Sequence, residues 1–256
     1  MKQNAWTKRM IIIFLVVQLV LYGSFLTMDF LGLYGDVNNY IKFTMVVLCF
    51  GYSLLCGKST SRGLLLSLQA ALFFTVVSDL FILILDYYFY GVLTFILVQL
   101  CYGIRMDISR NQNRLKREKT PLWKTILLRL GIQAATTIIT VAILTISNSK
   151  VDLLLIATVF YFTGIIINTI ASILLLVQQP RIKDNWIFAI GMCLFLLCDI
   201  NVGIFNLSGY IDLQGSVVKG MVTASALLMW AFYAPSQMLI ALTARRDDRR
   251  YRDSLH

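Results

Sequence analysis

The sequence of 256 residues contains little charge, proline or histidine: 14% of its residues are charged, and it has 3 prolines and 1 histidine. Soluble globular proteins average about 25% charged and about 45–50% apolar residues. Apolar residues make up 58% of this chain, and its mean hydropathy is +0.75. The composition therefore excludes a soluble globular domain. With 15 glycines, the sequence is neither collagen-like nor a disordered chain rich in Pro and Gly.

The 5 cysteines and the single histidine also limit the possible chemistry. All the cysteines fall within or at the end of apolar stretches, so no disulfide framework is implied. No two of them have CxxC spacing, and the histidine is His256. A zinc site needs several imidazole or thiolate ligands, which excludes a histidine-rich membrane metallohydrolase. Walker, GxSxG and HExxH motifs are absent as well. We expect no metal and no cofactor, and a chemistry of carboxylates, amides and hydroxyls.

Eight apolar runs are long enough to cross the roughly 30 Å hydrocarbon layer as helices. We predict an all-α, polytopic membrane protein in which residues 1–256 form a single transmembrane helical domain. The expected spans cover residues 10–27, 40–56, 64–85, 87–106, 124–146, 151–177, 186–206 and 219–243.

Basic residues predict the topology, because Lys and Arg collect in short cytoplasmic loops. With eight spans, 20 of the 23 basic residues fall on the side that holds both termini, and only Lys42, Lys150 and Lys219 fall on the other. We therefore predict an N-in, C-in integral membrane protein, in the cell membrane if the organism is bacterial. Residues 107–123 would form a basic cytoplasmic loop, and residues 244–256 a basic cytoplasmic tail.

The net charge of +10 raises the question whether the protein binds nucleic acid. No aromatic interleaving and no recognisable nucleic-acid-binding fold accompany it, so we expect no nucleic-acid partner. We interpret the charge as topology and as attraction to the anionic lipids of the bilayer.

Two acidic residues, Asp79 and Asp199, stand inside predicted spans, whereas the other 11 of 13 lie in loops, at termini or at helix ends. A carboxylate in the middle of a membrane helix costs about 2.5–3.5 kcal/mol on insertion scales and usually marks function. Both helices are expected to run outward, which places both acids roughly 9–12 Å below the outer surface, at about 1.5 Å per residue. At this equal depth they could share one cavity.

Amides and phenols follow each acid. Gln99 and Tyr102 lie in the next predicted span after Asp79, and Tyr233 and Gln237 lie in the one after Asp199. The alternative roles for such residues are a hydrogen bond between helices for the amides and an interfacial anchor for the phenols. Pro235 stands among them and frees a backbone carbonyl, an arrangement common beside a cavity.

Three ordered segments of the sequence resemble a known family. They are SDLFILILDYYFYGVLTFILVQLCYGI, AIGMCLFLLCDINVGIFNL and YAPSQMLIAL. Together they are similar to the signatures of the YhhN family, whose vertebrate relatives are lysoplasmalogenases. The resemblance assigns the two family acids to Asp79 and Asp199, and the other motif positions to Gly91, Phe95, Tyr102, Tyr233 and Gln237. This chain has Ser78, Gln99 and Cys198 where many members have Gly, His and Ser.

The resemblance implies hydrolysis of the vinyl ether bond of a lysoplasmalogen-type lysophospholipid to a fatty aldehyde and a glycerophospho-alcohol. An enol ether is protonated at carbon, and water captures the resulting oxocarbenium ion. This chemistry asks for one protonated and one ionised carboxyl group, as in glycoside hydrolysis. Our hypothesis is that Asp79 and Asp199 share one proton as the catalytic pair, while Gln99, Tyr102, Tyr233 and Gln237 orient water and the lipid head.

Two functions of other classes are also compatible with the sequence. The first is a proton-coupled transporter of a small molecule or lipid that uses the two intramembrane acids as proton carriers. The second is a small-ligand receptor or assembly partner without catalysis.

Overall fold

The structure is a computed structural model, which describes residues 2–33, 35–57, 61–112, 120–147, 151–207 and 216–244. Within these ranges the chain is helical and has no strand. The elements in chain order are α1 (Lys2–Phe30), α2 (Asp36–Cys56), α3 (Arg62–Asp79), η1 (Leu80–Ile84), α4 (Tyr88–Gln112), α5 (Leu122–Ile146), α6 (Leu153–Gln178), α7 (Lys183–Leu207) and α8 (Ser216–Leu242).

The eight predicted spans are confirmed: with α3 and η1 taken as one, the described residues contain 8 helices long and apolar enough to cross a membrane. One predicted helix end differs clearly from the structure. Helix α4 continues to Gln112, although we expected the helix to end at residue 106 and a loop to begin at residue 107. Residues 113–119 of that loop and residues 245–256 of the expected tail lie outside the described residues.

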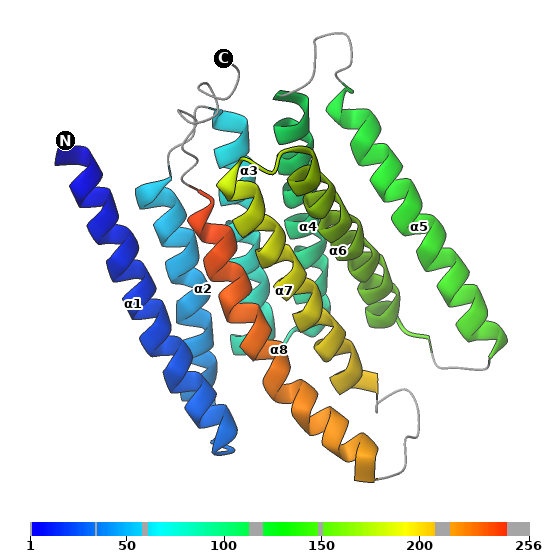
Figure 1. The fold of residues 1–256 in the computed structure, drawn as a ribbon. Helices are drawn as coiled ribbons and strands as arrows, with labels where there is room; N and C mark the ends of the chain where they lie inside the picture. Colours follow the sequence, from blue (N-terminus) through cyan, green and yellow to red (C-terminus); the bar gives the residue numbers. More distant parts are fainter. Residues whose placement is uncertain are drawn as a thin grey trace.

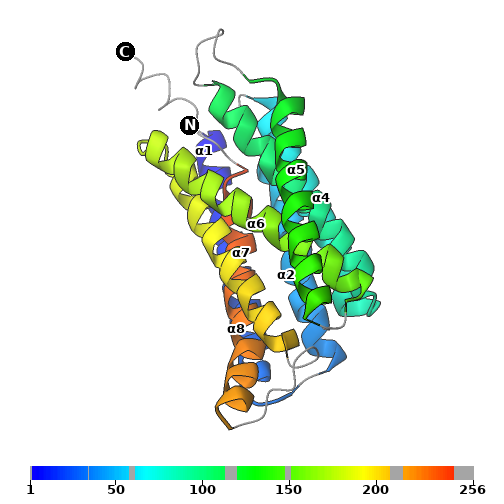
Figure 2. The ribbon, with the colours of Figure 1, turned by 90° about the vertical axis from the view of Figure 1, so that its right-hand side faces the viewer.

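The helices run side by side and alternate in direction, so that α1 begins and α8 ends at the same end of the bundle (Figure 1). We call this the terminal end and the opposite one the hairpin end. Figure 2 shows the same arrangement from the side of α5. An even number of spans leaves both termini on one side, as the N-in, C-in prediction requires.

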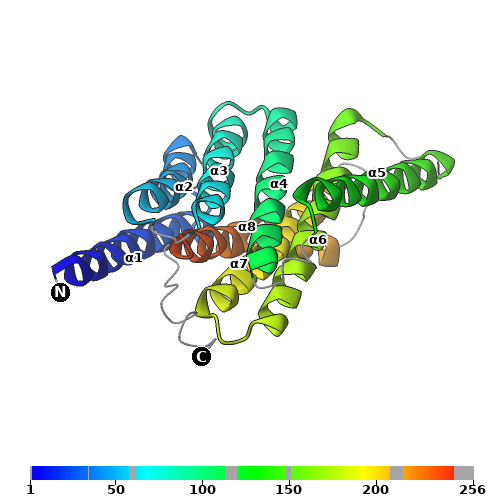
Figure 3. The same ribbon diagram turned by 90° about the horizontal axis from the view of Figure 1, so that it is seen from above.

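The most extensive helix contacts join α7 to α8 and α3 to α4, followed by α4 to α6. Helix α8 also packs against α2 and α1, and it lies in the middle of the bundle seen from above (Figure 3). Helix α5 lies at one edge, against α6 and α4. The interior is therefore formed around α3, α4, α7 and α8.

The regular helix geometry changes directly after Asp79. Residues 80–84 form the π-helical turn η1, in which the Leu85 amide donates to the Leu80 carbonyl at 3.0 Å. Wider turns of this kind are rare and occur mainly at functional sites. The hairpin then closes through Asp86 at φ 59°, a left-handed conformation that Asp and Asn tolerate better than most residues.

Gly91 allows α4 to approach α3 closely at this hairpin. The Ser78 hydroxyl donates to the Gly91 carbonyl at 2.6 Å. A Cβ atom at Gly91 would lie 2.8 Å from Cδ1 of Ile82 and 3.3 Å from the Ser78 carbonyl oxygen. The absence of a side chain at position 91 therefore fixes how the π-helical turn sits against α4.

Pro235 lies inside α8 and cannot donate to the carbonyl of Ala231, four residues earlier. The hydroxyl of Tyr22 on α1 donates to this carbonyl at 3.0 Å. The expectation that Pro235 frees a backbone carbonyl is confirmed, and the freed group helps to fix α1 against α8.

Two further acids are buried, which corrects the expectation that all but two of the acids face water. Asp29, at the end of α1, is 5% exposed and pairs with Lys42 of α2 at 2.9 Å. Asp107, in the last turns of α4, is 4% exposed and pairs with Arg129 of α5 at 3.4 Å. Asp107 lies inside α4, which continues past the end that the hydropathy pattern indicated, and each of the two acids is buried together with a basic partner.

Candidate active site

Asp79 is a buried carboxylate at the last position of α3, with 3% of its surface exposed. The hydroxyl of Tyr233 on α8 donates to its Oδ2 at 2.7 Å. Tyr233 is itself buried. This contact brings together two of the residues that the sequence had marked, from segments 154 residues apart.

Asp199 is half-buried on α7 and has its own phenol partner. The hydroxyl of Tyr161 on α6 donates to its Oδ2 at 2.6 Å. Tyr161 was not among the site residues predicted from the sequence. A signal was present, because a tyrosine in the middle of the run VFYFTGIII is too deep to be an interfacial anchor, and a buried phenol needs a hydrogen-bond partner.

The tyrosines of both aspartate–tyrosine pairs contact one aromatic side chain, Phe95 of α4. The Phe95 ring centroid lies 5.6 Å from that of Tyr161 and 6.4 Å from that of Tyr233. Both carboxylates also lie within electrostatic range of the Cys198 thiol, next to Asp199 in the chain. The pairs therefore belong to one cluster, assembled from α3, α4, α6, α7 and α8.

Gln99 lies one helical turn after Phe95 and is 2% exposed. Asn168 of α6 holds it twice, because its Nδ2 donates to the Gln99 backbone carbonyl at 2.7 Å and to Oε1 at 2.9 Å. The Nε2 of Gln99 has no hydrogen-bond partner among the described residues. Gln99 thus has an amide donor available at the level of the cluster.

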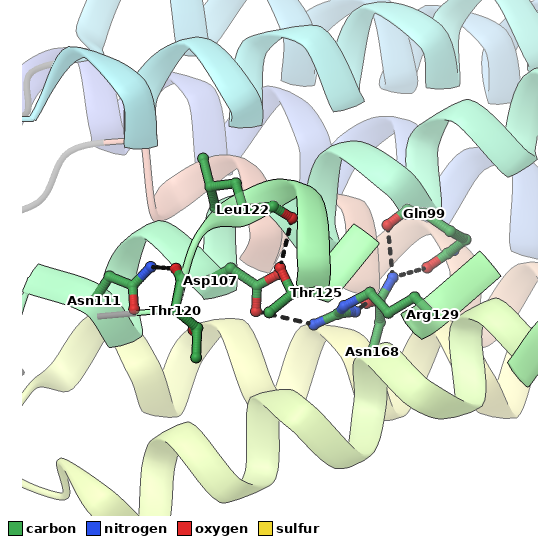
Figure 4. A network of polar contacts seen from close by, with 8 residues as sticks. All are labelled: Gln99, Asp107, Asn111, Thr120, Leu122, Thr125, Arg129 and Asn168. Carbon is green, nitrogen blue, oxygen red and sulfur yellow. Dashed lines mark hydrogen bonds and ion pairs between the residues drawn. The ribbon is translucent and has the colours of Figure 1, made fainter. Parts of the chain in front are cut away.

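A polar network continues from Gln99 toward the terminal end of the bundle (Figure 4). Arg129 of α5 donates through Nη1 to the Oδ1 of Asn168 and through Nη2 to the Oδ1 of Asp107. The network joins α4, α5 and α6. A polar Asn in the middle of the highly apolar α6 was the sequence signal that could have revealed it.

The other two predicted site residues do not contact the carboxylates by hydrogen bonds among the described residues. Tyr102 is fully buried, and its ring packs edge-on against Phe188 at 5.7 Å. Gln237 lies one turn after Tyr233 and is 1% exposed. Its Nε2 donates to Ser236 at 3.4 Å, while its Oε1 has no partner in the described part of the chain.

Tyr233 and Gln237 also line a crevice between α1, α2 and α8 that is too narrow to admit a water molecule. Helix α1 contributes Phe25 to it. The remaining lining residues come from α2 and α8 and are Lys42, Met45, Val46, Cys49, Trp230, Tyr233, Ala234 and Gln237.

The donor set of the cluster consists of carboxylates, phenols and one carboxamide. Its arrangement can transfer a proton to a bound molecule and stabilise a cation beside it. Within the described residues, no group of three or more His, Cys, Asp or Glu side chains could hold a metal ion.

A comparison with family models finds one match, to the YhhN family, over residues 37–244. No curated protein and no solved structure matches the chain. The matched residues include both aspartates, both tyrosines and Gln99.

Proposed function

Because the chain belongs to the YhhN family, we propose that it is a membrane-embedded hydrolase that cleaves the vinyl ether bond of lysoplasmalogen-type lipids. The products are a fatty aldehyde and a glycerophospho-alcohol. The single observation that carries the proposal is the pair of tyrosine-bonded carboxylates, Asp79 and Asp199, whose tyrosine partners both contact Phe95. As part of the same proposal, the protein is an integral multi-pass membrane protein with both termini in the cytoplasm.

The reaction begins with proton transfer from the protonated carboxyl group of the pair to the vinyl carbon remote from the ether oxygen. The oxocarbenium ion that forms is stabilised by the ionised carboxylate. This carboxylate then takes a proton from water as the water oxygen adds to the cationic carbon. The hemiacetal then collapses: the carboxyl group that took the proton from water gives it to the glycerol oxygen, which leaves as a hydroxyl group, while the hemiacetal hydroxyl loses its proton to the other carboxylate as the aldehyde forms. The pair again holds one proton.

The tyrosines hold the two carboxylates in fixed positions, since each donates its hydroxyl hydrogen to one carboxylate oxygen. The free Nε2 of Gln99 and the free Oε1 of Gln237 are suited to orient water and the polar part of the lipid. Tyr102 contributes to the wall of the site through its packing on Phe188.

A second candidate is a proton-coupled transporter of a small molecule or lipid. It is favoured by the π-helical turn after Asp79 and by Pro235 two residues after Tyr233, because transporters often bind their cargo at interrupted helices.

The test is release of aldehyde from a 1-alkenyl lysophospholipid by the purified protein in detergent. A transporter has no gradient to use there, whereas an enzyme still turns over. We expect Asp79→Asn and Asp199→Asn each to lower turnover by roughly 10²- to 10⁴-fold, the usual contribution of a general acid or base. The matched control is Asp86→Asn, at an exposed position of the same hairpin where Asn also tolerates the positive φ. A double Asp79/Asp199 variant with full activity would overturn the proposal.

A further inference from the structure

Gln99 lies between two polar side chains on one face of α6. Tyr161 and Asn168 stand seven residues apart, about two helical turns, so both project from the same side of that helix. Gly164 lies between them, and a Cβ atom there would lie 3.5 Å from the Cβ of Gln99. The missing side chain at position 164 therefore admits Gln99 of α4 to the space between Tyr161 and Asn168.

The direction of the hydrogen bonds around Gln99 is set by Arg129, because a guanidinium group can only donate. Arg129 Nη1 donates to Asn168, so the Oδ1 of Asn168 faces the arginine and its Nδ2 faces Gln99 (Figure 4). This Nδ2 donates to the Oε1 of Gln99 at 2.9 Å. The Nε2 of Gln99 therefore lies on the other side of its amide group, with two hydrogens to donate.

The Gln99 amide group interacts with the hydroxyl of Tyr161, although the contact does not have the geometry of a full hydrogen bond. The Tyr161 oxygen thus faces a donor, and its hydrogen goes to the Oδ2 of Asp199 at 2.6 Å. Donors therefore point in one direction all the way from the cation of Arg129 to Asp199. Hydrogen bonds donated to a carboxylate stabilise its ionised form. Among the described residues, the titratable groups that face Asp199 are Tyr161 and, on its own helix, Cys198.

Within the described residues, Asp79 has no such row of donors. The titratable groups that face it are the hydroxyl of Tyr233 on α8 and the thiols of Cys49 on α2 and Cys198 on α7. In the same part of the chain no donor holds the Tyr233 oxygen, so this hydroxyl is equally able to accept from a protonated Asp79. Asp79 is 3% exposed and loses more hydration on ionising than the half-buried Asp199. Neither acid forms an ion pair with a described basic residue.

We propose that Asn168 is a positioning residue of the reaction, which acts on Asp199 through Gln99. It directs the donors so that Asp199 is the ionised member of the pair and Asp79 the protonated one. The inference rests on the proposed hydrolase, for which it assigns the two roles. Asp79 gives its proton to the vinyl carbon, and Asp199 takes a proton from water and passes it to the glycerol oxygen. The proton of the hemiacetal hydroxyl returns to Asp79 as the aldehyde forms.

The pH dependence of kcat/KM for aldehyde release distinguishes the two roles. Activity needs one ionised and one protonated carboxyl group, so the profile has an acidic and a basic limb. We expect the residual activity of Asp199→Asn to lack the acidic limb and that of Asp79→Asn to lack the basic limb. The reverse pattern would overturn the assignment.

Asn168→Leu tests the positioning role. Without the amide of residue 168, Gln99 no longer has a fixed direction, so the acidic limb is expected to move to higher pH by about 0.5–1 unit while the basic limb stays in place. Asn206→Leu, at an exposed amide of α7, is the matched control and should move neither limb. If Asn168→Leu does not fold, Gln99→Met removes the donor to Tyr161 directly and should move the acidic limb in the same direction. Equal loss of activity at every pH, with both limbs in place, would show a purely structural role and overturn the proposal.

An infrared measurement separates this inference from the proposed function, since it needs no turnover. The carbonyl stretch of a protonated carboxyl group is followed in difference spectra between the wild type and each variant, in detergent at neutral pH. We expect the band in the wild-type protein and in Asp199→Asn, and its loss in Asp79→Asn. This pattern without aldehyde release from any ether lipid would refute the hydrolase and support the division of protons. A band lost in Asp199→Asn and kept in Asp79→Asn would overturn the inference whatever the activity.

Discussion

The hydroxyl of Tyr161 donates to the Oδ2 of Asp199 at 2.6 Å, from the neighbouring helix α6 to α7. Asp79 has the same kind of contact, with Tyr233 of α8 at 2.7 Å. The two acids thus have equivalent partners on different helices, although Asp79 is buried and Asp199 is only half-buried. Both carboxylates accept a hydrogen bond from a tyrosine, but they differ in how far they are buried. Two acids in different environments are suited to divide the roles of general acid and general base between them.

Removing the Tyr161 hydroxyl tests whether this contact positions Asp199. We expect Tyr161→Phe to lower kcat/KM for aldehyde release roughly 10- to 100-fold, because one hydrogen bond to a charged group is lost. The double variant Tyr161→Phe, Asp199→Asn should be no worse than Asp199→Asn alone, because both changes act on one unit. Tyr90→Phe, at an exposed phenol of the hairpin end, is the control. Full activity of Tyr161→Phe would contradict the role.

Asn168 should be important for stability, because it binds Gln99 and Arg129 at the same time. We expect Asn168→Ala to lower the free energy of unfolding by about 1–3 kcal/mol, measured by denaturant titration in micelles. Asn206→Ala removes an exposed amide that donates to the Val202 carbonyl of its own helix, and should have little effect. Equal unfolding midpoints for the two variants would show that the network does not stabilise the bundle.

A methyl group at position 91 should displace the π-helical turn. Its Cβ would lie within 3.3 Å of both Ile82 and the Ser78 carbonyl, so Gly91→Ala is expected to cost about 1–3 kcal/mol in the free energy of unfolding. A Cβ atom at Gly23 would have no other atom within 4 Å, so Gly23→Ala should not destabilise the protein. Thermal unfolding of the two variants in the same detergent makes the comparison, and a Gly91→Ala protein as stable as Gly23→Ala would contradict it.

The orientation predicted from the basic residues can be tested by cysteine labelling. Tyr87→Cys lies at the exposed turn of the hairpin end, and Thr120→Cys is exposed before α5 at the terminal end. With both termini in the cytoplasm, an impermeant maleimide should label Tyr87→Cys in intact cells and Thr120→Cys only after permeabilisation. The native cysteines are buried or half-buried, which limits the background. Labelling in the opposite order would refute the N-in, C-in topology.

The number of helices and the two central acids were predictable, because long apolar runs and the carboxylates within them can be recognised in the sequence without knowledge of the tertiary structure. The pairing Tyr233–Asp79 was not, since it joins segments 154 residues apart and depends on how α8 lies in the bundle. Lys42 was assigned to the side opposite the termini by charge counting. Counting could not show that its charge is paired with that of Asp29 and that both side chains are buried.

The π-helical turn η1 escaped prediction for a different reason. Its residues, LFILI, have the same apolar character as a regular α-helix. The wider turn follows from the closure of the hairpin at Asp86 and the close approach of Gly91, which are properties of the folded chain. Tyr161 and Asn168 were missed because a single polar residue within a span is more often a simple contact between helices.

Phe95 links the two aspartate–tyrosine pairs through ring contacts. Its ring touches the rings of both tyrosines that hold the aspartates, and the ring of Phe195 besides. A smaller side chain at this one position would remove the contacts that join the two pairs without changing either carboxylate. For engineering of the proposed hydrolase, position 95 is thus a place at which the fit to bulkier ether lipids can be varied.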